Sequence, residues 1–139
     1  PIKLDTNGTC PEVLEVLLNL DLLDYIAMDI KTSAENYHML WPGRPSLEKI
    51  VKSIRIIMDH APDYEFRTTC VKPFVSMSNM AELSKMIAGA KRYRLQRCSK
   101  DVTVLDPDFL KSDDRFFSET QMDDLKKIAQ KYVEGISNR

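Results

Sequence analysis

The chain alternates short stretches typical of β-strands with longer stretches typical of α-helices, and this alternation limits the folds open to it. The expected strands lie at residues 2–4, 25–31, 64–70 and 93–98. Between them, apolar residues recur with the spacing of helices. Strands that alternate with helices form right-handed βαβ units and a parallel sheet. We therefore predict an α/β fold with a parallel sheet and outer helices, in a single domain over residues 1–139.

Signals for helix starts support this division of the chain. Thr9 and Glu12 have the spacing of a capping box in front of the first helix. The stripe of that helix expected to be buried contains Val13, Val16, Leu17 and Leu20. The expected N-caps of three later helices are Ser46, Ser78 and Ser118. The last of these helices is expected to end at Gly135.

Composition excludes several classes of protein. Of the 139 residues, 43% are hydrophobic and 29% are charged, as in a soluble globular domain. The net charge of −1 gives no sign of a nucleic-acid or membrane surface, and no leader peptide is evident. Three widely spaced cysteines (Cys10, Cys70 and Cys98) favour reduced thiols in a cytoplasmic protein. They do not form a metal-binding motif, so no metal ligand is assigned.

One face of every expected strand is polar. Side chains alternate across a strand, so Asp29 and Lys31 share a face at the end of the strand 25–31. The polar faces of the four strands together contain Lys3, Asp5, Asp29, Lys31, Glu65, Arg67, Arg94 and Gln96. A parallel sheet covered on both sides would be apolar on both. The pattern therefore indicates a partial (β/α) barrel with a polar interior that holds a polar ligand. Ordinary exposed ion pairs are the alternative.

Two carboxylates are expected to meet in that interior. Asp5 and Asp29 fall at the ends of neighbouring strands, where ligands bind in α/β folds. Carboxylates that converge repel each other unless a cation lies between them. We expect them to share Lys31, a water molecule or a metal ion.

Four segments in order carry a family resemblance. They are Lys-Leu-Asp-Thr-Asn-Gly at 3–8, Asp-Tyr-Ile-Ala-Met-Asp-Ile-Lys at 24–31, Tyr-Glu-Phe-Arg-Thr-Thr at 64–69 and Tyr-Arg-Leu-Gln at 93–96. Together they resemble the C-terminal part of the radical S-adenosylmethionine enzymes that activate glycyl radical enzymes. The anaerobic ribonucleoside-triphosphate reductase and pyruvate formate-lyase activating enzymes are the types most similar. The resemblance covers nearly the whole chain.

The resemblance implies a fold and a cofactor site. Members of the family form an incomplete barrel of six β/α units, and this chain corresponds to strands three to six. The family's Cys-x-x-x-Cys-x-x-Cys loop, which holds a [4Fe–4S] cluster, is absent from this chain, as is its glycine-glycine-glutamate motif. By resemblance, the residues that bind S-adenosylmethionine are Asp5, Thr6, Asn7, Asp29, Lys31, Arg67 and Gln96.

The implied chemistry is the reductive cleavage of S-adenosylmethionine to a 5′-deoxyadenosyl radical, which abstracts a glycine hydrogen from a partner enzyme. Without cluster ligands, this chain alone is expected to be inactive, and no residue of it is assigned as catalytic. One alternative is a non-catalytic half-barrel that serves as a binding or regulatory module. Another is an aldolase-like barrel in which Lys31 forms a Schiff base, although Asp29 would keep that amine protonated. An exposed strand at 2–4 also predicts a homodimer through that edge.

Overall fold

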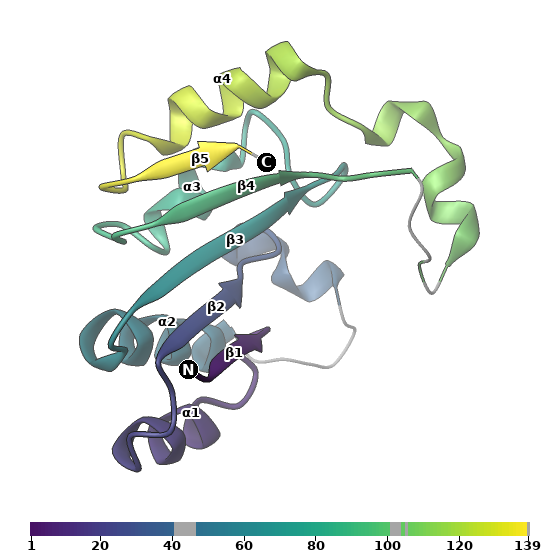
Figure 1. Cartoon of the computed structure of the whole chain (residues 1–139). Coiled ribbons are helices and arrows are strands. Elements are labelled where there is room, and N and C mark those ends of the chain that lie inside the picture. The colour runs from purple at the N-terminus through teal and green to yellow at the C-terminus, as the bar shows by residue number, and fades with distance from the viewer. Residues whose placement is uncertain (41–46, 101–103, 105, 139) are drawn as a thin grey trace.

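A single parallel sheet organises the molecule. The computed structural model describes residues 1–40, 47–100, 104 and 106–138. The strands are β1 (Lys3–Thr6), β2 (Tyr25–Asp29), β3 (Tyr64–Cys70), β4 (Tyr93–Arg97) and β5 (Ile136–Asn138). All neighbours are parallel, and the strands lie side by side in chain order (Figure 1). The predicted α/β class and parallel sheet are confirmed.

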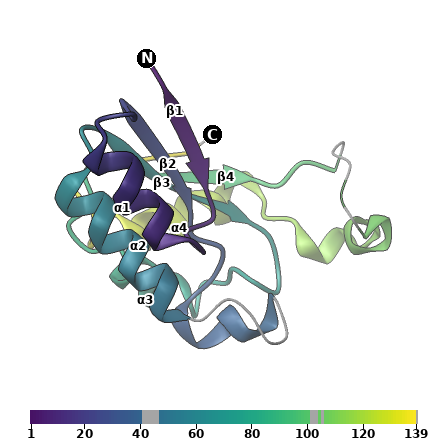
Figure 2. The same cartoon turned by 90° about the horizontal axis from the view of Figure 1, so that it is seen from below.

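The helices lie on one face of this sheet. They are α1 (Pro11–Asn19), α2 (Leu47–His60), α3 (Met80–Lys85) and α4 (Glu119–Ala129). The connections also contain 3₁₀ helices: η1 (Ala34–Met39) between β2 and α2, and η2 (Pro107–Lys111) and η3 (Asp113–Arg115) between β4 and α4. Figure 2 shows α1, α2 and α3 on the same side of the strands. Strands in chain order with helices on one face have the winding of a β/α barrel. In the described part of the chain, no helix is long and apolar enough to cross a membrane.

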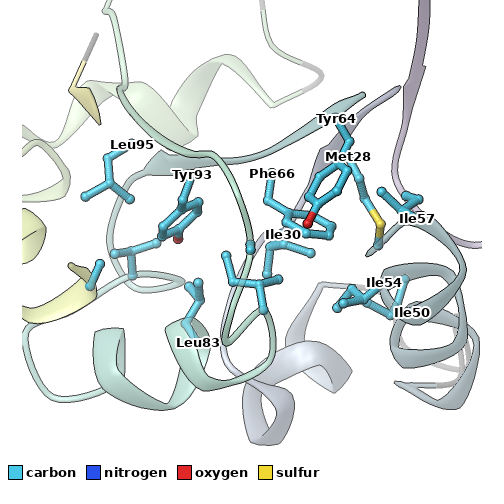
Figure 3. Packing of buried hydrophobic residues seen from close by; sticks show 14 of the residues in the cluster. Met28, Ile30, Ile50, Ile54, Ile57, Tyr64, Phe66, Leu83, Tyr93 and Leu95 are labelled. Atoms are coloured by element: carbon cyan, nitrogen blue, oxygen red, sulfur yellow. The ribbon is translucent and has the colours of Figure 1, made fainter. Parts of the chain in front are cut away.

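The core fills the space between sheet and helices. Alternate residues of the three central strands β2, β3 and β4 point toward the helices and are at most 2% exposed, among them Ile26, Met28, Tyr64, Phe66, Tyr93 and Leu95. They meet an apolar stripe on α2 and α3 formed by Ile50, Ile54, Ile57 and Leu83 (Figure 3). Each fully buried side chain of this size contributes about 1.5–3 kcal/mol to stability. The other face of the sheet is therefore left free for polar residues.

The first helix buries a different stripe from the one predicted. Pro11 and Leu14 are buried, whereas Val13, Val16 and Leu20 are 54%, 56% and 61% exposed. This helix has apolar residues at two overlapping helical spacings, so its sequence is compatible with either face. Packing against α2 and the core selects the stripe that contains Leu14. The prediction was wrong for Val13, Val16 and Leu20, whereas Leu17 packs against the core as expected.

The predicted helix starts have mixed outcomes. Ser118 and Gln121 form a complete capping box at α4. Thr9 does not cap α1: its hydroxyl contacts Asn7, and Cys10 occupies the N-cap. At α3 the N-cap is Asn79 instead of Ser78. The predicted cap Ser46 lies outside the described residues.

The last helix is shorter than predicted and a strand follows it. The sequence predicted one helix as far as Gly135, but α4 ends at Ala129 and β5 follows at Ile136–Asn138. A three-residue strand with one apolar residue carries almost no alternation signal, so the sequence pattern could not reveal it. β5 pairs with β4 and extends the sheet beyond the four strands expected.

Candidate functional site

The polar face predicted from the sequence exists, and its strands are in register. Asp29 on β2 lies beside Arg67 on β3, and Arg67 lies beside Arg94 on β4. Asp5 on β1 pairs with Ala27 on the neighbouring strand β2. The side chain of Ala27 is small and leaves room for the longer polar side chains on this face. Because successive residues alternate between faces, all of these side chains project on the side opposite the helices.

A guanidinium group links the two predicted carboxylates. Arg67 Nη1 is 2.8 Å from Asp5 Oδ1, and Arg67 Nε is 2.9 Å from Asp29 Oδ1. Lys31 Nζ is 2.8 Å from the other oxygen of Asp29. We call Asp5, Asp29, Lys31 and Arg67 the acid–base cluster. It lies at the carboxyl ends of β1 and β2, where α/β folds place their ligand sites.

The cation between the carboxylates is not the one predicted first. Asp5 and Asp29 do converge, but Arg67 joins them, while Lys31 contacts only Asp29 among the described acids. The planar guanidinium has several donors in a fixed geometry and can bind two carboxylates at once, which a lysine ammonium does less well. Lys3 also approaches Asp5, at 3.4 Å.

Burial and charge act in opposite directions on Arg67. Its side chain is only 17% exposed, and this loss of hydration by itself would lower the pKa. The carboxylates of Asp29, Asp5 and Glu65 outweigh that effect and hold the pKa of Arg67 above its ordinary value. Arg67 is therefore a permanent positive charge at the centre of the acid–base cluster.

Two further ion pairs continue the pattern toward the amino ends of the strands. Glu65, whose side chain is 6% exposed, is 3.2 Å from Arg94, and Asp63 pairs with Arg92. The Asp63–Arg92 pair was missed, although each residue stands two positions before a member of the Glu65–Arg94 pair and so shares its face. A hollow of about 220 Å³ is lined by Glu65, Arg92, Arg94 and Gly135, among others, and by no member of the acid–base cluster.

The side chains of Thr6 and Asn7 form hydrogen bonds within the turn after β1. Thr6 Oγ1 accepts a hydrogen bond from Gly8 N at 3.1 Å, and Asn7 Oδ1 accepts one from Thr9 N at 3.1 Å. Gly8 has φ of +74°, a conformation that favours glycine. Thr6 follows Asp5 in the strand, so its side chain is on the helix-covered face. The structure therefore assigns Thr6 and Asn7 to the shape of the turn, and their contact with a ligand stays a prediction.

Gln96 shares the polar face but stands apart from the cluster. It lies on β4 beside Thr69, two strands from Asp29. It is half-buried and faces the same side as Arg94. A ligand would have to extend across β3 to reach both Gln96 and the acid–base cluster.

The cysteines are dispersed over the fold. Cys10 is exposed before α1, Cys70 is buried at the end of β3 and Cys98 follows β4. Burial raises the pKa of the Cys70 thiol to about 12, so it remains a neutral core residue at physiological pH. Among the described residues, no group of three His, Cys, Asp or Glu side chains could hold a metal ion. The thiols of the described chain thus do not fit an iron–sulfur cluster.

The chemistry of the acid–base cluster suits binding. Its carboxylates can accept hydrogen bonds from hydroxyl or ammonium groups, and its two cations can pair with a carboxylate. The cluster therefore offers both acceptors and cations to a polar ligand.

The chain is similar to a protein of Methanocaldococcus jannaschii that carries the provisional name glycyl-radical enzyme activating enzyme. The two are 32% identical over 141 aligned positions, which cover 98% of this chain. This chain is a relative of the glycyl-radical enzyme activating enzymes. The resemblance seen in the sequence is thereby confirmed. No family model and no solved structure matches the chain.

The match covers only part of the activating-enzyme relative. The chain spans 57% of that protein's length. Activity, substrates and partners of a whole activating enzyme are consequently matters for a proposal about this chain. The acid–base cluster is the part of the chain on which such a proposal can be built.

Proposed function

We propose that this chain is part of a radical S-adenosylmethionine activating enzyme and that its acid–base cluster binds the cofactor. The observation that carries the proposal is the convergence of Asp5, Asp29, Lys31 and Arg67 at the carboxyl ends of neighbouring strands. Its charges complement the ammonium, carboxylate and ribose hydroxyl groups of S-adenosylmethionine. Gln96 then lies where it would meet a more distant part of the same molecule.

The chain would form the C-terminal part of a six-unit barrel in the cytoplasm. Strand order and the one-sided helices support the barrel in this proposal. The [4Fe–4S] cluster would be held by residues outside the described chain, because the thiols of this chain do not fit one. When bound, the reduced cluster and the cofactor would supply a 5′-deoxyadenosyl radical able to abstract a hydrogen atom from a glycine of the partner enzyme. The residues of this chain would bind the cofactor, orient it and shield it from water.

The location of the cofactor can be tested by hydrogen–deuterium exchange on the whole protein. At a cofactor concentration 100 times Kd, amides that exchange only from the free state should slow by about 100-fold. We expect this protection in segments 5–8 and 29–32. Protection confined to the hollow beside Glu65, Arg94 and Gly135 would place the ligand elsewhere and contradict the proposal.

A half-barrel that binds without cluster chemistry is the alternative function. It predicts that the whole protein, supplied with iron, sulfide and reductant, binds S-adenosylmethionine without cleaving it. The enzyme proposal predicts release of 5′-deoxyadenosine under the same conditions. The two functions thus differ in one measurable product.

We also propose that the β1 edge associates with another protein segment, which in the isolated chain is a second copy. Within the described chain, β1 pairs only with β2, so its other edge has free N–H and C=O groups. Val13 and Val16 on α1, Leu20 at its C-cap and Ile2 before β1 are large apolar residues that are each more than half exposed. A partner that adds both a strand and a helix would cover both features.

Sedimentation velocity at micromolar concentration tests the association. The isolated chain should sediment as a dimer, and Val16→Glu should shift it toward the 16.0 kDa monomer. Met77→Glu is the matched control, because Met77 is an exposed apolar residue remote from α1. A wild-type chain that stays monomeric at every concentration would rule out the dimer.

A further inference from the structure

The peptide unit between Ile30 and Lys31 is held by side-chain hydroxyl groups on both of its polar atoms. The ladder between β2 and β3 ends where Ile30 N donates to Arg67 O at 2.8 Å. The carbonyl oxygen of Ile30 then accepts a hydrogen bond from Thr68 Oγ1 at 2.6 Å. The N–H of Lys31 donates to the phenol oxygen of Tyr37 at 3.2 Å. Side chains thus replace backbone partners where the chain leaves the sheet.

These hydroxyl groups form a buried network. Tyr93 OH donates a hydrogen bond to Thr68 Oγ1 at 2.7 Å, and Thr68 Oγ1 in turn donates to the Ile30 carbonyl oxygen. Thr68, Tyr93 and Tyr37 are 0%, 1% and 4% exposed. Burial raises the pKa of Tyr37 to about 12 and also raises that of Tyr93, so both phenols remain neutral. Figure 3 shows Tyr93 and Ile30 on the helix-covered side of the sheet.

Burial of the Thr68 and Tyr93 hydroxyl groups costs free energy, and the need to fill space in the core does not explain why they are there. Valine in place of Thr68 and phenylalanine in place of Tyr93 would fill similar volumes without the burial of a hydroxyl. The hydroxyls are instead linked to the Ile30–Lys31 peptide, which is the second of the two peptide units between Asp29 and Lys31. Thr68 binds its carbonyl oxygen directly, and Tyr93 acts through Thr68. On the opposite face, the side chains of that Asp29–Lys31 pair meet at 2.8 Å.

We propose that Tyr37, Thr68 and Tyr93 are positioning residues that hold Asp29 and Lys31 in place for the ligand of the acid–base cluster. This inference rests on the proposed function. Tyr37 and Thr68 fix the peptide directly, and Tyr93 acts through Thr68. The network sets the direction in which the backbone leaves β2, and hence where the carboxylate and ammonium groups lie before a ligand arrives.

The first test measures amide exchange on the whole protein without ligand. In Tyr37→Phe, the Lys31 amide should exchange about 3- to 10-fold faster, as expected for loss of one buried hydrogen bond. The amides of Phe66 and Tyr93, whose backbone acceptors are unaffected, should not change. Tyr132→Phe is the control, because Tyr132 is a half-buried tyrosine outside this network. Equal acceleration at all three amides, or none at Lys31, would overturn the proposal.

The second test measures affinity for S-adenosylmethionine. Thr68→Val should weaken binding by about 3- to 10-fold, Thr68→Ser should restore it, and the exposed-site control Thr120→Val should have no effect. A Thr68→Ser variant as weak as Thr68→Val would show that the methyl group matters, and would overturn the role of the hydroxyl. Unchanged affinity in Thr68→Val, with a wild type that binds, would overturn the positioning role alone. A wild type that does not bind would overturn the proposed function, and the positioning role with it.

Discussion

Replacement of Gly8 by alanine is expected to lower the free energy of unfolding by about 2–4 kcal/mol. Gly8 has φ of +74°, which costs a residue with a side chain about 1–2 kcal/mol. A Cβ at this position would lie 2.1 Å from Met28 Cε. The methionine side chain must move, and it is fully buried, so this adds about 1–2 kcal/mol. Urea denaturation followed by circular dichroism measures the loss.

Gly89→Ala separates the two causes. Gly89 has φ of +82°, but its added Cβ would lie 3.8 Å from Met58 Cε, an ordinary contact. This variant should therefore lose only the backbone contribution, about 1–2 kcal/mol. Equal losses of stability in the two variants would show that the clash between Met28 and an added Cβ at position 8 does not contribute.

Replacement of Arg67 by methionine is expected to cost about 2 kcal/mol of stability. The change leaves the carboxylates of Asp5 and Asp29 on neighbouring strands without the cation that joins them. Loss of one partner of a buried ion pair costs about 3–5 kcal/mol. The value here is smaller, because Asp5 is 56% exposed and water screens it.

Two further variants define the cause. Arg67→Lys keeps the charge but cannot reproduce the two-sided contact, so we expect a loss of about 1 kcal/mol. Arg55→Met, at an exposed position of α2, should change stability by no more than about 0.5 kcal/mol. An Arg67→Met protein as stable as wild type in urea would contradict the central role of this guanidinium.

The polar face could be predicted because it rests on the simplest periodicity in proteins. Alternation over two residues places Asp29 and Arg67 on one face whatever the details of packing, and parallel strands bring them to one level. The family resemblance depended on the same segments. The identity of the bridging cation was not accessible in this way, because Lys31 and Arg67 both carry a positive charge near Asp29. Only the arrangement of β1, β2 and β3 in space shows that Arg67 is the one that joins Asp5 to Asp29.

Other features depend on tertiary packing that no local pattern encodes. The face predicted for α1 was wrong for Val16 because Val16 and Leu14 belong to two overlapping apolar stripes, and packing against α2 and the core decides between them. The network at Thr68 was missed because a threonine on the buried side of a strand is also a normal core residue. Its role depends on Tyr93 and Tyr37, which are distant in sequence.

Titration calorimetry on an Asp29→Asn variant of the whole protein measures whether the acid–base cluster binds S-adenosylmethionine. Asp29 contacts both Lys31 and Arg67, so its charge supports the whole cluster. We expect Kd to rise about 10- to 100-fold, the effect of one charged hydrogen bond. Asp59→Asn, an exposed acid on α2, should leave Kd unchanged. A folded Asp29→Asn protein whose Kd lies within twofold of the wild-type value would show that the acid–base cluster does not bind S-adenosylmethionine.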